Sequence, residues 1–439
     1  MTSQPSQPIQ PVQPATKSFY GLGIAPKLLE ILTSKKFTIP TPIQERCIPS
    51  ALEGKDLVGI AQTGTGKTLA FSIPLVQRLA STPNARGLIL VPTRELALQA
   101  DETLKTIGGP LGMKTAVVIG GASMYAQVQQ LRRNPHVIIA TPGRLNDHLA
   151  SKSVNLAGVK ILVLDEADRM LDMGFEPQIS KILALIPKER QTLLFSATMP
   201  DQIVKIANKY MQLPLRVEVA RAGTAAEKVV QELFFVAKPA KTQLLASLLA
   251  QYRGTVLVFV RTKHGAHRLS RDLKALNCSA AEIHGDRSLS QRKEALEGFK
   301  TGRYRVLVAT DIAARGIDVT GIELVLNFDL PMNPEDYVHR IGRTGRAGMA
   351  GRAISFATPD QRNDVRDIER LVRYALPISR LPMNMPVLPE LPKHTYIEPT
   401  PRQFHRRPSS GAQSSGGFGS QRRFGSNRGQ SRGGFSGRR

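Results

Sequence analysis

Ala61-Gln62-Thr63-Gly64-Thr65-Gly66-Lys67-Thr68 is the stretch that decides the fold of this sequence. It follows the short apolar run at residues 57–60 and precedes a run with helical character, which is the strand–loop–helix setting of a phosphate-binding loop. Gly64 and Gly66 allow backbone N–H groups to approach phosphate oxygens at the start of a helix, where anions are favoured. The strict pattern begins with Gly where this stretch has Ala61, a mild departure. The stretch predicts a site for the phosphates of a nucleotide.

A second stretch, Asp165-Glu166-Ala167-Asp168, follows another apolar run at residues 161–164. Lys67 of the first stretch can reach the β- and γ-phosphates, and the Thr68 hydroxyl can ligate Mg²⁺. Asp165, at the end of a strand, can hold the Mg²⁺ through water, and Glu166 can orient the attacking water. Taken alone, each stretch could be a glycine turn or an acidic helix start. Together, each after an apolar strand, they predict hydrolysis of a nucleoside triphosphate.

The composition indicates a partner of opposite charge. The chain has 439 residues, which suggests two or three domains, and its 60 basic and 35 acidic residues give a net charge of +25. Such a charge favours a polyanionic partner. Cys47 and Cys278 are too few for a disulfide framework or a zinc site, so we expect both to be buried in a reducing compartment. No apolar run approaches the roughly 20 residues of a membrane span, and residues 1–14 do not resemble a signal peptide. We expect a cytoplasmic protein with no membrane contact.

Short apolar runs alternate with helical patterns twice along the chain, which predicts an α/β fold with parallel sheets and helices on both faces. We expect a flexible leader at 1–17, a first lobe at 18–213, a linker at 214–228 and a second lobe at 229–374. Only the first lobe contains a phosphate-binding loop. The expected strands are 57–60, 88–91, 115–119, 137–140, 161–164 and 192–195, then 232–236, 255–260, 280–283, 305–309, 323–328 and 352–357.

The remaining residues, 375–439, are Pro-rich and then rich in Gly, Ser and Arg. From residue 393 onward, Lys393 and nine Arg face Glu398 alone, a net charge of +9. Phenylalanines are spaced through this tail without an apolar period. The pattern is typical of a disordered segment that binds single-stranded RNA without reading its sequence, although a merely solvated end would look similar.

The acidic stretch at 165–168 spells the name of a known family, and residues 19–372 resemble DEAD-box RNA helicases of superfamily 2. The basic-tailed form resembles their bacterial RhlE group. The resemblance implies two tandem RecA-like lobes, ATP and Mg²⁺ as cofactors, and RNA as a partner. The motifs that carry it, in family order, are TPIQ at 41–44, the loop at 61–68, PTREL at 92–96, GG at 120–121, TPGR at 141–144, DEAD at 165–168, SAT at 196–198, VFV at 258–260, ATD at 309–311, RGID at 315–318 and HRIGRTGR at 339–346.

The resemblance assigns contacts to the nucleotide. Gln44 would use its amide on the adenine edge, where a side chain that both donates and accepts can select ATP. Phe19 would stack on the base, with core packing as the alternative. Asp318 would accept from a ribose hydroxyl. Arg343 and Arg346, in the lobe without the loop, would be arginine fingers; the alternative is that both contact RNA.

The resemblance also assigns coupling and RNA contacts. Ser196 and Thr198 would bond to Asp168 and relay the nucleotide state, with His339 and Arg340 as partners from the second lobe. Two departures from the family pattern are Lys36 in place of Gly and Leu289 in place of Gln, and the second puts one RNA contact in doubt. The RNA contacts implied by the resemblance are Arg94, Gly121, Thr141, Arg144, Arg261, Arg292 and Thr310.

The expected function is an RNA-dependent ATPase, a monomer that locally unwinds or remodels RNA duplexes and RNA–protein complexes by ATP-driven closure of two lobes. Its substrates could be ribosomal precursors or RNAs of the decay machinery. Three alternatives stay open from the residues: a motor that translocates on DNA, an ATP-gated RNA clamp or chaperone whose tail anneals strands, and a scaffold with a vestigial nucleotide site.

Overall fold

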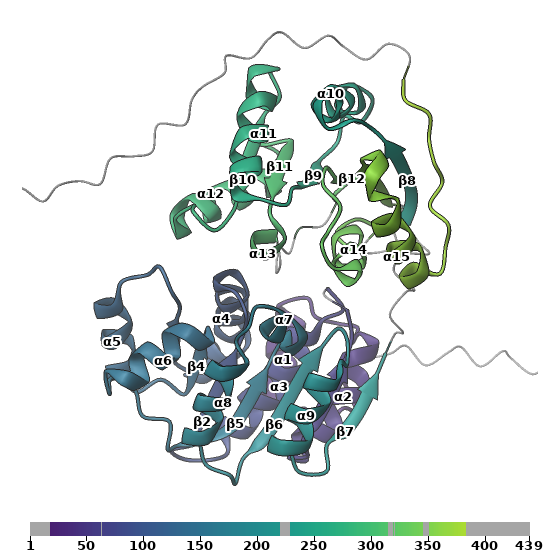
Figure 1. Cartoon of the computed structure of the whole chain (residues 1–439). Coiled ribbons are helices and arrows are strands. Elements are labelled where there is room, and N and C mark those ends of the chain that lie inside the picture. The colour runs from purple at the N-terminus through teal and green to yellow at the C-terminus, as the bar shows by residue number, and fades with distance from the viewer. Residues whose placement is uncertain are drawn as a thin grey trace, which may run out of the picture. The chain divides into compact units, whose positions relative to one another are not determined.

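A computed structural model describes residues 18–62, 64–219, 229–314, 319, 321–345 and 351–382 (Figure 1). These residues form two α/β lobes, each built on one parallel sheet. The expected leader, the part of the expected tail beyond residue 382, and the predicted site residues Thr63, Asp318 and Arg346 lie outside the described residues. The first residues of the expected tail, 375–382, are described, and Ile378 pairs in parallel with Leu233 of the second lobe.

The first sheet has seven strands in the order β3-β4-β2-β5-β6-β1-β7, and every pair in it is parallel. Its strands are short because each apolar run is short, and β1, β4 and β6 are buried along their whole length. The strands are β1 (Leu57–Ile60), β2 (Arg86–Leu90), β3 (Thr115–Val118), β4 (Val137–Ala140), β5 (Val159–Leu164), β6 (Gln191–Ser196) and β7 (Leu215–Glu218).

Helices cover both faces of the first sheet because alternate strand residues point to opposite sides. Ile161 and Val163 of β5 pack with helices on one face, and Leu162 and Leu164 pack with helices on the other. The helices of the first face are α1 (Pro26–Ser34), α2 (Pro42–Leu52), α3 (Lys67–Ala80) and α4 (Arg94–Gly108), followed by the short 3-10 helix η1 (Gly109–Leu111). Those of the second face are α6 (Pro142–Ala150), α7 (Ala167–Asp172), α8 (Glu176–Leu185) and α9 (Asp201–Tyr210), while α5 (Met124–Arg132) contacts β3.

The second sheet has six parallel strands in the order β10-β11-β9-β12-β13-β8. Helices α10 (Lys241–Gln251) and α11 (Lys263–Ala275) cover one face, and α12 (Leu289–Lys300), α13 (Asp311–Ala314), α14 (Pro334–Ile341) and α15 (Arg362–Val372) cover the other. The strands are β8 (Val229–Phe235), β9 (Val256–Phe259), β10 (Ala280–Ile283), β11 (Val306–Ala309), β12 (Leu324–Asn327) and β13 (Gly351–Ala357), with 3-10 helices at η3 (Lys238–Ala240) and η4 (Pro359–Gln361).

The predicted fold class, two parallel-sheet α/β lobes, is confirmed, and most expected strands lie within a few residues of the observed ones. The prediction was wrong at one point. Residues 215–218, expected to belong to the linker, form β7 and pair with β1 at the edge of the first sheet. Only Val217 of this edge strand is buried. A strand with one buried side chain needs no run of apolar residues, and such a run was the signal used to predict strands. In the part of the chain that the structure describes, no helix is long and apolar enough to cross a membrane.

Asp56, directly before β1, links that strand to both of its neighbours. Its carboxylate accepts from the backbone N–H of Thr192 in β6 at 2.7 Å, and from the N–H of Gln212, ahead of β7, at 2.7 Å. The Asp56 carbonyl accepts from the N–H of Leu215 at 2.9 Å. One side chain therefore aligns the three strands that surround the phosphate-binding loop.

We expect Asp56→Ala to lower the free energy of unfolding of the first lobe by about 2–3 kcal/mol, because two backbone N–H groups lose their acceptor. Asp56→Asn keeps one carbonyl oxygen and should lose less. Urea unfolding followed by circular dichroism measures both variants. Equal midpoints for the wild type and Asp56→Ala would contradict this role of Asp56.

Candidate functional site

The order of the first sheet brings three motifs to one edge. Strands β5, β6 and β1 are neighbours, and because all strands are parallel their carboxyl ends meet at the same edge. The acidic stretch follows β5, Ser196 ends β6, and the phosphate-binding loop follows β1. Ligands of open parallel sheets bind at this edge. Segments that are far apart in the sequence therefore form one site.

The phosphate-binding loop has the backbone that its glycines allow. Gly64 and Gly66 have φ of +85° and +92°, and Gly66 is the residue directly before α3. Lys67 is only 5% exposed, and its ammonium donates to the carbonyl of Ala61 at 2.9 Å. The N–H of Ala61 in turn donates to the carbonyl of Ser196 at 3.0 Å. Ala61, the departure from the strict pattern, is buried and connects the loop to β6.

Three buried carboxylates face this loop: Asp165, Glu166 and Asp168. Glu166 has a positive φ of +51°, a strained conformation for a residue with a side chain, and it accepts from the Arg169 guanidinium at 2.6 Å. Burial alone would raise the pKa of Glu166, but the charges of Arg169, Lys67 and Arg343 together lower it. Glu166 is therefore an ionised carboxylate at neutral pH.

Asp165 differs from Glu166 because burial dominates over the nearby cations. Burial raises the pKa of Asp165 to about 6, although Lys67 opposes this shift. Lys67 therefore compensates the ionised form of Asp165 only in part, and a divalent cation would add further positive charge. Within the described residues, no group of three or more His, Cys, Asp or Glu side chains is placed to hold a metal ion. Mg²⁺ is commonly held in proteins by one or two carboxylates, waters and substrate phosphates. Asp165 and the Thr68 hydroxyl fit that role.

Asp168 joins the carboxylate cluster to the segment after β6. Its carboxylate accepts from the N–H of Ala197 at 3.0 Å, and from the N–H and hydroxyl of Thr198 at 2.9 and 3.1 Å. The N–H of Asp168 donates to the Ser196 hydroxyl at 3.2 Å. The structure thus brings together the three residues for which the resemblance implies a relay.

Gln44 contacts the phosphate-binding loop through its amide. Its carbonyl oxygen accepts from the N–H of Thr41 at 2.9 Å, and its NH₂ group donates to the carbonyl of Gly66 at 3.0 Å. Each end of the amide keeps capacity for one more hydrogen bond. Lys36, which replaces a family Gly, has a φ of +63°, a conformation that glycine adopts without strain.

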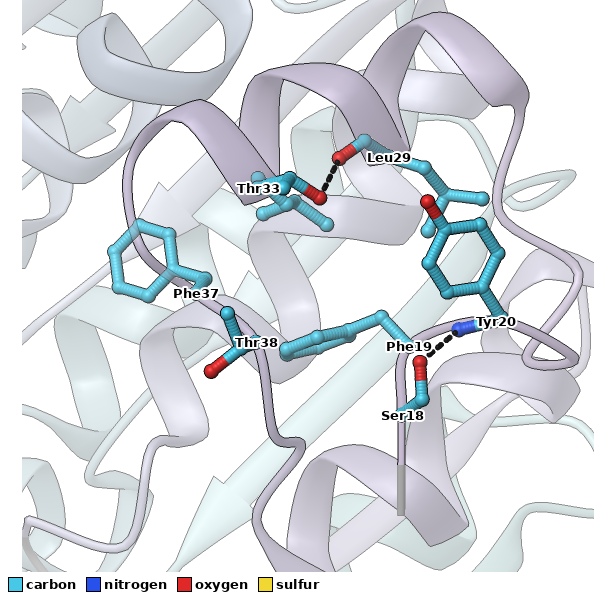
Figure 2. A pocket seen from close by; sticks show the side chains of 8 residues that line it. Ser18, Phe19, Tyr20, Leu29, Thr33, Phe37 and Thr38 are labelled. Carbon is cyan, nitrogen blue, oxygen red and sulfur yellow. Dashed lines mark hydrogen bonds between the residues drawn. The ribbon is translucent and has the colours of Figure 1, made fainter. Parts of the chain in front are cut away.

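Phe19 lies beside a small cavity of about 200 Å³ (Figure 2). The cavity is lined by Phe19, Phe37, Thr38 and neighbours from α1. Phe19 itself is 3% exposed and belongs to the core of the first lobe. Core packing is therefore observed for Phe19, and stacking on a base stays a prediction.

The second lobe contributes cations near the carboxylates. The guanidinium of Arg169 lies 3.5 Å from the Nδ1 atom of His339, and Arg343 is close enough to affect the pKa of Glu166. Burial and the charge of Arg169 lower the pKa of His339 to about 3, so its ring is neutral. Arg340 is fully buried and bonds to both carboxylate oxygens of Asp311 at 2.5 and 2.7 Å. Arg340 therefore fixes α14 to α13.

The RNA contacts predicted in the first lobe cluster at one end of the sheet. Gly121 has a φ of +74°, and a Cβ atom there would clash with the guanidinium of Arg94. Arg144 donates to the carbonyl of Ala122 at 2.9 Å, and Thr141 is the residue directly before α6. The structure thus brings Arg94, Gly121 and Arg144 together around one turn.

In the second lobe, Arg261 and Thr310 follow the carboxyl ends of β9 and β11. Arg292 is 7% exposed and forms an ion pair with Glu95 at 2.9 Å. Its charge is therefore already balanced by a carboxylate, and a contact with RNA stays a prediction. Gln291 forms a capping box with Ser288 at the start of α12, so its amide serves the helix.

Sequence reasoning missed a buried pair of side chains, Gln127 and His148, that lies behind the Gly120-Gly121 turn. The amide of Gln127, on α5, accepts from the N–H of Ile119 at 3.2 Å and donates to the carbonyl of Ile119 at 2.9 Å. His148, on α6, lies 3.3 Å from the same Gln127 oxygen through Nε2, and its Nδ1 lies 2.6 Å from the Ser153 hydroxyl. Because that oxygen only accepts, Nε2 carries the proton. Burial, followed by the charge of Arg144, lowers the pKa of His148, in keeping with a neutral ring.

Two parallel-sheet lobes, one of which carries a phosphate-binding loop beside buried carboxylates, define a nucleoside-triphosphate-hydrolysing enzyme of the two-lobed motor class. The first lobe matches the DEAD/DEAH box helicase family over residues 41–206, and the second matches the helicase conserved C-terminal domain over residues 240–348. The chain belongs to the DEAD/DEAH box helicase family.

Curated relatives and solved structures agree with this family. The chain is 44% identical over 345 residues to the ATP-dependent rRNA helicase RRP3 of Debaryomyces hansenii, covering 78% of this chain and 72% of that protein. It is 45% identical over 346 residues to RRP3 of Candida albicans, covering 78% and 65%. The bacterial RhlE group suggested by the sequence gains no support from these fungal relatives.

Two solved structures are similar over the described lobes. S. cerevisiae Dbp5 bound to RNA and ADP BeF3 has a TM-score of 0.75 at 32% identity, covering 83% of this chain and 95% of that one. Mss116p bound to ssRNA and AMP-PNP has a TM-score of 0.75 at 30% identity, covering 82% and 77%.

We expect Gln127→Met to raise the RNA concentration for half-maximal stimulation of ATP hydrolysis about tenfold. The thioether fills the space but leaves both polar groups of Ile119 without partners, so the turn at Gly121 loses its support. Hydrolysis without RNA and the rate at saturating RNA should stay near the wild-type values.

Gln130→Met is the matched control, because Gln130 lies on the same helix, is exposed and accepts only from the N–H of Val117 at 3.2 Å. Equal shifts in the two variants, or a fall in the saturated rate alone, would show that Gln127 does not position the turn.

Proposed function

We propose that the chain is an RNA-dependent ATPase that separates or remodels short RNA duplexes and RNA–protein complexes through ATP-driven closure of its two lobes. The observation that carries this proposal is the buried cluster of Lys67, Asp165, Glu166 and Asp168, connected by hydrogen bonds to the segment after β6. The relatives named as ATP-dependent rRNA helicases and the similar structures bound to RNA with nucleotide analogues support it.

Hydrolysis would depend on the different states of two neighbouring carboxylates. Lys67 would bind the β- and γ-phosphates, and Asp165 and Thr68 would hold Mg²⁺, which neutralises phosphate charge when bound. Glu166 is held ionised by Arg169, so it can accept a hydrogen bond from the attacking water and orient it.

Arg343 and Arg346 of the second lobe would stabilise the charge that develops on the transferred phosphoryl group. Arg343 is held by a hydrogen bond from its Nε atom to the carbonyl of His339 at 3.3 Å. Gln44, Phe19 and Asp318 would contact the adenosine part of ATP.

Asp168, Ser196 and Thr198 would transmit the state of the nucleotide from the acidic stretch to β6. His339 of the second lobe would take part through its contact with Arg169 of the first lobe. Arg340 would keep α14, which carries His339, in place.

RNA would bind across the carboxyl edges of both sheets, through backbone and hydroxyl contacts that do not read bases. The proposed contacts are Arg94, Gly121, Thr141, Arg144, Arg261, Arg292 and Thr310. Because the curated relatives are named as rRNA helicases, we propose ribosomal precursor RNA as the substrate class. We propose the cytoplasm as the site of action from the sequence alone, which has two scattered cysteines.

Stimulation of ATP hydrolysis by single-stranded RNA, compared with DNA of the same length, tests the proposal directly. RNA should stimulate hydrolysis and DNA should not. Equal stimulation by both would favour a motor that works on DNA, and no stimulation by either would favour a scaffold.

We expect Glu166→Gln to lower the rate of ATP hydrolysis by about 10²–10⁴-fold and to leave ATP binding intact. The amide removes the negative charge that orients the water, while Lys67 and Asp165 are unchanged. RNA should then dissociate slowly in the presence of ATP. Hydrolysis near the wild-type rate would contradict the role of Glu166.

We expect Arg343→Ala to lower the rate of hydrolysis at saturating RNA by about 10³-fold or more, with little change in ATP affinity. The guanidinium is proposed to interact most strongly in the transition state, so binding in the ground state needs it less. Arg343→Lys, which keeps the charge but loses the planar donors, should recover only part of the rate. A loss of ATP affinity in proportion to the loss of rate would contradict the finger role.

A further inference from the structure

The exposed face of α11 is a continuous row of cationic and titratable side chains. Lys263, Arg268, Arg271 and Lys274 are exposed, as are His264 and His267. The only acidic residue of the helix, Asp272, is buried. We call these six exposed residues the α11 face.

The α11 face begins at the edge where RNA is proposed to bind. Ala266, Leu269 and Leu273 pack the opposite side of the helix on the sheet, beside β10 and β11 (Figure 1). The helix starts directly after Thr262, which caps it, and Arg261 precedes that cap. A helix that connects parallel strands runs back along the sheet. From residue 263 to residue 274 the α11 face therefore extends about 17 Å away from Arg261.

The acidic groups near the α11 face compensate its charge only in part. Arg268 and Arg271 share Asp272, each at 3.8 Å, which is a long and weak ion pair. Lys263 pairs with Asp286 at 2.8 Å. His267 lies 3.0 Å from the Glu282 carboxylate through Nδ1, and Arg287 pairs with the same carboxylate. Burial, followed by the charges of Arg287, Arg271 and Lys274, lowers the pKa of His267, in keeping with the positive charge around it.

Helix α15 shows what a balanced helix looks like in the same lobe. It also exposes three arginines, Arg362, Arg366 and Arg370, but it carries Asp364, Asp367 and Glu369 among them. Arg370, for example, pairs with Asp367 at 2.8 Å. Solvation and pairing within the helix account for the exposed arginines of α15. The exposed side of α11, by contrast, carries cationic side chains and no acidic side chain.

We propose that the α11 face binds the phosphate backbone of RNA beyond the segment held at the carboxyl edges of the sheets. This inference rests on the proposed function. The occupant is RNA because the face continues from Arg261, and because cationic side chains without exposed apolar neighbours suit phosphates. An interfacial membrane helix needs an exposed apolar side, and the apolar side of α11 is buried in the lobe.

The test compares Arg268→Gln/Arg271→Gln with Arg366→Gln/Arg370→Gln in the full chain. Both double variants remove two positive charges, so the net charge of the protein changes equally. RNA affinity is measured across a salt series with a short single-stranded RNA and with one several times longer. We expect the α11 variant to bind the long RNA roughly three- to tenfold more weakly at low salt. Its log–log salt slope should be about 1.4 shallower, since each phosphate contact on a single strand contributes about 0.7.

The short RNA, the α15 variant and hydrolysis at saturating RNA should be unaffected. An equal loss of RNA affinity in the two variants would show that only the overall charge of the protein matters, and this would overturn the proposal. Unchanged RNA affinity in both variants would overturn it as well. A loss of saturated turnover or of short-RNA binding in the α11 variant would place these residues in the core site instead, which also overturns it. Failure of the proposed function is separate, because it would appear as absent RNA stimulation in the wild type.

Discussion

The buried ammonium of Lys67 is the charge on which the first lobe depends. Three carboxylates, Asp165, Glu166 and Asp168, are buried around it, and its charge lowers the pKa of each against the effect of burial. Buried charges are costly unless an opposite charge lies near. Residues from α3 and from the end of β5 must therefore come together, and the order of the parallel strands makes this possible. The same compensation prepares the site for phosphate.

The peptide groups of Ala61 connect this charge cluster to the rest of the lobe. The carbonyl of Ala61 accepts from Lys67, and the N–H of Ala61 donates to the carbonyl of Ser196. The hydroxyl of Ser196 accepts from the N–H of Asp168. If the Lys67 ammonium moved toward a phosphate, its hydrogen bond to Ala61 would change. The two further hydrogen bonds would pass that change to β6 and to the acidic stretch. The continuity of this network gives a physical basis for coupling nucleotide binding to other motifs.

The cationic side chains of the second lobe fall into two groups, one buried and one exposed. Arg340 is buried, bonds to Asp311 and serves the architecture, and Arg343 is buried near the hydrolytic carboxylates. The cations of α11 are exposed and incompletely paired. An exposed charge whose ion pair is long, as for Arg268 and Arg271, stays available to a phosphate, whereas a buried and closely paired charge such as that of Arg340 does not. The two lobes share an architecture, but only the first carries a phosphate-binding loop.

The sequence determined the strands, their parallel arrangement and the core of the nucleotide site, because short apolar runs followed by loops carry both signals locally. Lys67, Glu166 and Asp168 could be placed in one site because their strands end at the same edge. Only the tertiary structure decided β7, the Gln127–His148 pair and the ion pair between Arg292 and Glu95. Each of these depends on partners that are distant in the sequence, and the local pattern of apolar and polar residues carries no information about them. The contrast between α11 and α15 was also hidden, because both helices are rich in Arg, and burial of Asp272 is a property of the folded chain alone.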